Sequence, residues 1–178
     1  MFEKIEILAV ELLGQFGYME APIPIKKLIK NLGIEIKPEY LGDEISGLLV
    51  IEDKRTIIGY NSSEPTVRQR FTLAHELGHH ILHRSESSNE KLFVDKIMYR
   101  KNFTSKKEKK QEMEANVFAS RILMPENLVK SEFNKILDSL DHLTEEDIIN
   151  RMASIFKVSS ISMTYRLSNL NLLENRVH

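Results

Sequence analysis

One segment constrains this chain more than any other, the run PTVRQRFTLAHELGHHILH from Pro65 to His83. Its apolar residues recur at three- and four-residue steps, which predicts a helix with one broad buried face. That face comprises Phe71, Ala74, Leu77, Gly78 and Ile81. His75 and His79 stand four residues apart, so on a helix both imidazoles project to the same side, about one turn from each other. Any fold of this chain must therefore accommodate a largely buried helix that carries paired histidines.

The histidine pair has the spacing of a metal site. Both imidazoles can reach one ion, and zinc accepts such nitrogens at about 2.0–2.1 Å. Glu76 is rotated about 100° round the helix, so it flanks the ion and is placed to act as a general base on a water molecule there. A structural helix in which HExxH occurs by chance is the plain alternative. The longer signature HExxHxxGxxH is absent, because position 85 is Ser85 rather than histidine.

A third ligand is expected from the segment QEMEANVFASRILMP, residues 111–125. The chain has no cysteine, so any ligand must come from His, Asp or Glu. Glu112 shares a helical face with Ala115, Asn116 and Ala119, whereas Glu114 points about 200° away from it. A carboxylate on an apolar face is costly unless a cation neutralises it, which favours Glu112 over Glu114 as the ligand. The alternative is an ordinary amphipathic helix with Glu112 in solvent.

Neighbours of these residues have expected supporting roles. The small Ala115 and Ala119 would let the two helices approach closely, and Asn116 would accept the second ring proton of a ligating histidine. His83 lies about 12 Å along the helix from His75, so we expect it to pack beside the site rather than ligate. His80 is rotated away from the pair, and we expect it to be exposed.

The rest of the chain predicts an α+β fold. The pattern predicts helices at residues 2–17, 24–33, 65–83, 107–124, 126–137, 145–156 and 160–170. It predicts strands at 34–38, 47–51 and 55–60, with a possible edge strand at 92–98. The strand at 57–61 is a candidate edge for pairing with an extended substrate, or else an ordinary sheet strand.

The composition argues against several classes of protein. The chain holds 25 basic and 26 acidic residues, which disfavours direct binding of nucleic acid. The stretch RKNFTSKKEKK, residues 100–110, could attract an acidic partner, but a solvated loop leading into a helix is the favoured interpretation. No run approaches the roughly 20 apolar residues of a membrane span, and the first residues lack a signal-peptide pattern. We therefore expect a soluble, cytoplasmic protein without membrane partners.

The segments IIGYNSSEPTVRQRFTLAHELGHHILH and EMEANVFASRILMP closely resemble the ImmA/IrrE family of metallo-endopeptidases. The resemblance spans roughly residues 46–125 and implies a zincin-like metallopeptidase domain at 1–125, with a small sheet and an HExxH helix. It assigns Zn²⁺ to His75, His79 and Glu112, and the catalytic role to Glu76. The helical remainder, 126–178, contains MASIFKVSSISMTYRLSNL, which looks like a degenerate helix-turn-helix (HTH).

Three functional hypotheses follow. The resemblance implies a zinc-dependent endopeptidase that cleaves a helix-turn-helix transcriptional repressor and so relieves repression. A non-catalytic module that binds such a repressor is one alternative, and a DNA-binding regulator with a relic zincin core is the other. For the enzyme, zinc would acidify the attacking water while Glu76 moves its proton to the leaving amine. Tyr60, Tyr99 and Tyr165 all remain candidates for stabilising the oxyanion.

Overall fold

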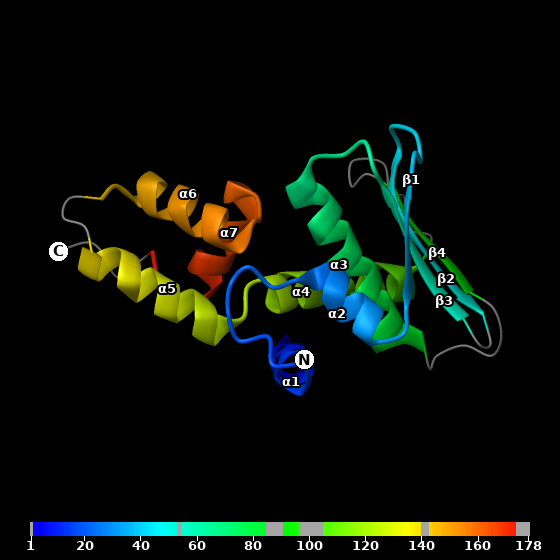
Figure 1. The fold of residues 1–178 in the computed structure, drawn as a ribbon, viewed down its shortest axis with the longest axis horizontal. Helices are drawn as coiled ribbons and strands as arrows, with labels where there is room; N and C mark the ends of the chain where they lie inside the picture. Colours follow the sequence, from blue (N-terminus) through cyan, green and yellow to red (C-terminus); the bar gives the residue numbers. More distant parts are fainter. Residues whose placement is uncertain (1, 53–54, 85–90, 97–104, 140–142, 174–178) are drawn as a thin grey trace.

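The computed structural model describes residues 2–52, 55–84, 91–96, 105–139 and 143–173, with the backbone alone at 91–96. The helices are α1 (Phe2–Gln15), α2 (Ile25–Asn31), α3 (Thr66–His83), α4 (Lys106–Leu123), α5 (Glu126–Ser139), α6 (Glu145–Phe156) and α7 (Ser160–Asn169). The strands are β1 (Glu35–Glu39), β2 (Ile45–Glu52), β3 (Arg55–Asn61) and β4 (Lys91–Lys96). The fold is α+β, as predicted, with the sheet at one end of the molecule and α5 to α7 at the other (Figure 1).

The four-stranded sheet has the order β1-β3-β2-β4. β3 pairs in parallel with β1 and antiparallel with β2, and β2 pairs antiparallel with β4. The interpretation of residues 57–61 as an edge strand is therefore wrong, because both sides of β3 are already hydrogen-bonded. The edge strands are β1 and β4, and β4 agrees with the edge strand expected at 92–98, although residues 97 and 98 lie outside the described part of the chain.

The helix α3 lies between the sheet and α4 (Figure 1). On the side of α3 that faces α4, the two helices are in close contact at a glycine. A Cβ placed at Gly78 of α3 would lie 3.2 Å from the Cα of Ala115 and 3.1 Å from the ring of Phe118, both on α4. The small Ala115 thus permits the close helix approach that was expected from the sequence. Backbone contact at this point sets how far α3 and α4 stand apart.

Buried arginines tie the C-terminal helices to the rest of the molecule. Arg166 of α7 is 1% exposed and donates from Nη2 to both carboxylate oxygens of Glu6 on α1, at 2.8 and 3.0 Å. The Nε of Arg121 on α4 lies 2.9 Å from the same Glu6 carboxylate. Arg70 of α3 donates to the backbone oxygens of Lys157 (3.1 Å) and Ile23 (3.0 Å). Arg70 thus holds the turn between α6 and α7 against α3, while Arg166 and Arg121 join α7 and α4 to α1.

The apolar core is continuous along the chain. One cluster of buried side chains includes residues of α1, α2, the sheet, α3 and all four C-terminal helices, α4 to α7. The division into domains 1–125 and 126–178 stays a prediction, as does the HTH-like character of α6 and α7. Among the described residues, no helix combines the length and the apolar character needed to cross a bilayer.

The packing at Gly78 leads to a stability prediction. Gly78→Ala inserts a methyl group against the backbone of α4, so we expect the free energy of unfolding to fall by about 1–3 kcal/mol, as overpacking usually costs. Gly14→Ala is the control, because a Cβ at Gly14 on α1 meets nothing within 4 Å. That change should leave stability unchanged or raise it by up to about 1 kcal/mol. Urea unfolding of both variants tests this, and equal stabilities would contradict the close approach.

Candidate metal centre

Three side chains from two helices converge on one point. His75, His79 and Glu112 each offer a ligand atom, and these atoms lie within 4.8 Å of one another. The Nε2 atoms of the two histidines are 3.0 Å apart, and the Glu112 carboxylate oxygens lie 3.5 Å from His75 and 3.3 Å from His79. Two nitrogens and one carboxylate are a donor set that suits zinc and leave a further coordination position open. The structure thus brings together the residues singled out from the sequence.

The hydrogen bond of His75 and the burial of His79 suit a ligand role. Asn116, one turn after Glu112, lies with its side-chain oxygen 3.0 Å from Nδ1 of His75. An amide oxygen only accepts, so Nδ1 donates the proton and Nε2 keeps its lone pair free for a metal. Burial lowers the pKa of His79, although the hydrogen bond to Glu112 opposes this shift. The lowered pKa of His79 favours its neutral form, which is the form that binds metals.

Glu76 is fully buried beside the histidines and faces β2. The position a Cβ would take at Gly47 of β2 lies 3.2 Å from Oε1 of Glu76 and 2.3 Å from Cγ2 of Thr72. Only glycine leaves room there for these two α3 side chains. Sequence reasoning missed Gly47, although a glycine inside a strand is a known sign of close approach by another part of the chain.

The remaining acidic and histidine candidates lie outside the cluster. Glu114 is turned toward His83, with 3.9 Å between its Oε2 and the His83 Nε2. His83 is buried, with Nε2 3.2 Å from the backbone oxygen of Gln111, in keeping with a packing role. His80 was expected at the surface but is half-buried, because α3 is covered on more than one side. Burial lowers the pKa of His80 to about 4, and the charge of Arg84 adds to this.

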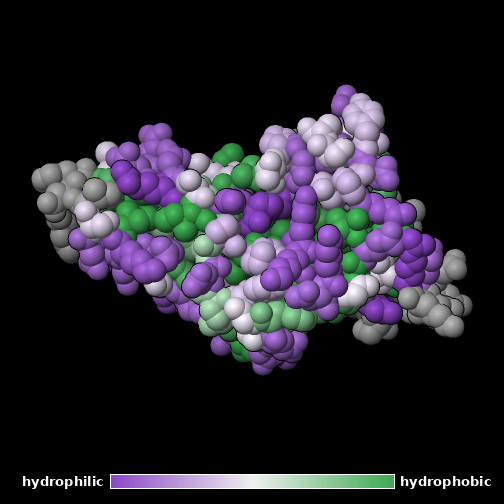
Figure 2. All heavy atoms as spheres, viewed as in Figure 1, coloured by the Kyte–Doolittle hydropathy of each residue, from purple (hydrophilic) through white to green (hydrophobic). Residues whose placement is uncertain are grey.

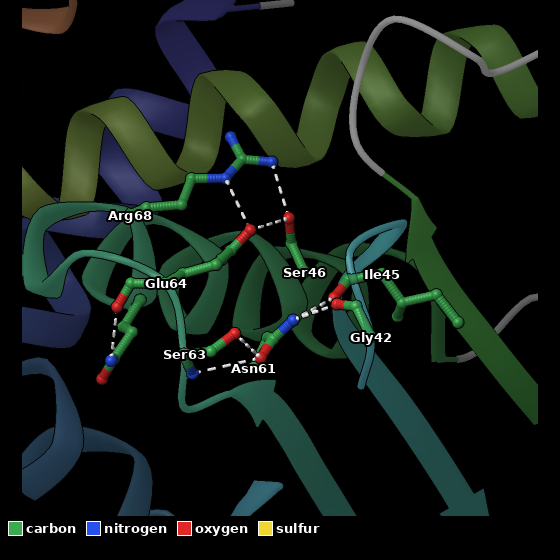
Figure 3. A network of polar contacts seen from close by, with 8 residues as sticks. Gly42, Ile45, Ser46, Asn61, Ser63, Glu64 and Arg68 are labelled. Carbon is green, nitrogen blue, oxygen red and sulfur yellow. Dashed lines mark hydrogen bonds and ion pairs between the residues drawn. The ribbon is translucent and has the colours of Figure 1, made fainter. Parts of the chain in front are cut away.

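A polar network fixes the first turn of α3 on the sheet (Figure 3). Arg68 donates from Nη2 to the buried Ser46 hydroxyl at 3.0 Å, and that hydroxyl donates to Glu64 at 2.7 Å. The side-chain amide of Asn61 donates to the backbone oxygens of Gly42 (2.6 Å) and Ile45 (3.0 Å). The start of β2 and the loop before α3 are thereby held together. This network orients the helix that carries both histidines.

A cleft of about 960 Å³ opens beside the cluster, and His75, Glu112 and Asn116 line it. Its walls come from α3, α4 and α7, so it runs from the candidate metal centre to the C-terminal helices. Tyr165 of α7 lines this cleft and is 69% exposed. Tyr60 is buried and its hydroxyl accepts from Nζ of Lys26 at 2.8 Å. Tyr99 lies outside the described residues.

Comparison with known proteins agrees with these features. A peptidase family model described as the IrrE N-terminal-like domain matches residues 29–168, which is most of the chain. The chain belongs to the ImmA/IrrE family. This confirms the resemblance seen in the sequence, and such a metallopeptidase-like family implies a metal.

One relative and one solved structure show how far the similarity extends. The Metallopeptidase ImmA of Bacillus subtilis (strain 168) is 27% identical over 116 residues, which make up 65% of this chain and 59% of the relative. The chain thus spans well under two thirds of that relative's length. A Mycobacterium tuberculosis transcriptional regulator of known structure superposes with a TM-score of 0.60 at 16% identity, covering 93% of this chain and 46% of that one. At this identity the second match shows the fold alone.

The geometry predicts which carboxylate matters for the metal. Glu112→Gln should weaken Zn²⁺ binding severely, because it removes the charge beside both imidazoles. Glu114→Gln, two residues away on the same helix, is the matched control and should bind normally. Asn116→Ala should cost roughly 10–100-fold in affinity, as is typical when a ligand loses its supporting hydrogen bond. Competition with a zinc-binding dye measures all three, and normal binding by the Glu112 variant would refute the assignment.

Proposed function

We propose that this chain is a zinc-dependent endopeptidase that acts in the cytoplasm, with His75, His79 and Glu112 as metal ligands and Glu76 as the catalytic residue. The observation that carries the proposal is the convergence of two imidazoles and one carboxylate beside a wide cleft. The donor set fits zinc, since no thiolate is available and the arrangement leaves space for a reactant. Family membership supports the same class of chemistry.

In this proposal the protein's own side chains position the reactants and move the proton. A bound zinc ion supplies Lewis acidity, which polarises the scissile carbonyl and makes a water molecule more acidic. Glu76 accepts the proton of the attacking water and delivers it to the leaving amine. Its burial against Gly47 holds the carboxylate in place, and Asn116 keeps His75 in the tautomer with a free Nε2. Of the candidate tyrosines among the described residues, Tyr165 lines the cleft and Tyr60 does not, and no oxyanion role is assigned to either.

For the substrate we propose a helix-turn-helix transcriptional repressor, whose cleavage relieves repression. The support is the resemblance to the ImmA/IrrE family, whose model matches residues 29–168. A direct DNA-binding role is disfavoured by α7, which would be the reading helix of an HTH pair. Its single basic residue, Arg166, is buried in the ion pair with Glu6 and cannot meet phosphate or bases.

Glu76→Gln tests the mechanism. We expect the variant to bind Zn²⁺ like the unaltered chain, because the three ligands are intact, and to lose at least about 10²–10⁴-fold in hydrolysis, the usual contribution of a positioned general base. Release of peptide fragments from a candidate repressor, followed by mass spectrometry, is the measurement. Glu11→Gln, at an exposed position of α1 outside the cleft lining, serves as the control and should retain hydrolysis.

The same variant separates the hypotheses. If Glu76→Gln still relieves repression in a reporter strain, the chain acts by binding the repressor rather than by cutting it. If it cleaves at the normal rate, the proposed mechanism is wrong. Salt-sensitive binding of duplex DNA by the unaltered chain would favour the regulator hypothesis instead.

A further inference from the structure

One face of α4 runs the whole length of the cleft. The residues of this face recur at three- and four-residue steps, and they are Lys106, Lys109, Lys110, Met113, Val117, Ser120 and Met124. Glu112, a proposed zinc ligand, lies about one third of the way along this face. At 1.5 Å per residue, Lys106 stands about 9 Å before Glu112 along the helix axis and Met124 about 18 Å after it. The cleft therefore has two arms of different chemistry, one on each side of the candidate metal centre.

The arm at the start of α4 is cationic. Lys106 and Lys109 are exposed, line the cleft and have no ion-pair partner among the described residues. Lys110 is a further cation there, 3.8 Å from Glu114 at its nearest. Among the described residues that line the cleft, Glu112 is the single carboxylate, and a bound metal ion would neutralise it. The described part of this arm thus offers the positive charges of Lys106 and Lys109 to a ligand.

The opposite arm is apolar, and α7 forms its wall. Ile161 is 71% exposed and Tyr165 is 69% exposed, and both line the cleft together with Val158 and Met124. Figure 2 shows apolar residues at the surface where α7 approaches α3. Large exposed side chains of this kind on one helix mark a contact surface for a polypeptide. They do not suit a nucleic acid backbone.

The wall is held rigidly in place. The ion pair of Arg166 with Glu6 anchors α7 from its buried side, and Arg70 holds the turn that leads into α7. Ile161 and Tyr165 are thus presented to the cleft by a helix that does not need to be ordered when a ligand binds. Such preorganisation lowers the entropic cost of binding.

We propose that the cleft selects a polypeptide segment that carries acidic residues on one side of the cleaved bond and a large apolar residue on the other. The proposal rests on the proposed endopeptidase function, because it places the bond to be cut at the metal centre between the two arms. Acidic side chains meet Lys106 and Lys109, and the apolar side chain packs on Ile161 and Tyr165. The α7 wall is then a specificity determinant for a protein substrate.

A mixture of synthetic dodecapeptides with randomised central positions tests this on the full chain loaded with Zn²⁺. We expect cleavage products to be enriched in Asp and Glu on one side of the cut and in Leu, Ile, Met or Phe on the other. The double variant Lys106→Glu/Lys109→Glu should lower kcat/KM roughly tenfold for an acidic peptide, and leave a peptide with Gln in place of the acids unchanged. Lys4→Glu/Lys30→Glu reverses two exposed charges outside the cleft and is the matched control.

The apolar arm has an equally close control. Ile161→Ser/Tyr165→Ser should lower kcat/KM roughly tenfold for peptides with the apolar residue and only slightly for peptides with Ser in its place. Ile7→Ser/Tyr40→Ser removes the same two side-chain types from exposed positions outside the cleft and should change neither. Circular dichroism of all variants should match that of the unaltered chain, since each altered side chain is exposed.

The outcomes separate the two proposals. Cleavage without either preference, or equal losses in the control variants, overturns the selectivity of the cleft while the endopeptidase stands. If no peptide is cut, the proposed function fails, and the selectivity is then judged by which peptides the immobilised Glu76→Gln protein retains. Retention without enrichment in acidic and apolar residues would overturn it as well. Competition by duplex DNA for the same retained peptides would point to a nucleic acid as the occupant.

Discussion

The close contact between α3 and α4 is the constraint on which the rest of the structure depends. Gly78 and Ala115 bring the two helix backbones together, and the histidine pair on α3 then faces Glu112 on α4. Removing a carboxylate from water without a counter-charge costs free energy, and so does removing an imidazole without a bonding partner. The contact therefore places three groups where each is costly alone and where a single divalent cation would compensate all of them.

The surroundings of the cluster keep its groups oriented. Glu76 is fully buried between α3 and β2, where Gly47 leaves the space that its carboxylate occupies. On the other side, Asn116 fixes the tautomer of His75. Low local dielectric strengthens each of these interactions, and it also makes any mispositioned group costly. The polar network around Arg68 and Ser46 joins α3 to the sheet, so α3 is held in place relative to β2.

Buried charged groups, rather than a second apolar core, hold the C-terminal helices in place. Arg166 donates to Glu6 and to the backbone oxygen of Met124, so α7 is joined to both α1 and the end of α4. Because Arg166 is bound in this way, it cannot contact phosphate. The same arrangement turns the exposed Ile161 and Tyr165 toward the cleft. We propose that α6 and α7, whose sequence looks HTH-like, present this surface to a protein substrate.

Much of the candidate site was predictable because helical periodicity is local. The four-residue step between His75 and His79, and the face shared by Glu112 and Asn116, follow from 3.6 residues per turn alone. Helix bounds behave similarly, and α6 begins and ends where its pattern predicted, with a capping box at Thr144.

Other features required the tertiary structure, because they depend on contacts between residues distant in sequence. Strand order is one, since no local pattern says that β3 lies inside the sheet. The burial of His80 and the approach of Gly47 to Glu76 are others. The position of α7 beside the cleft is a further one, because Arg166 is paired with Glu6, 160 residues away in the chain. Periodicity determines which side chains share a face, but only packing decides what that face meets.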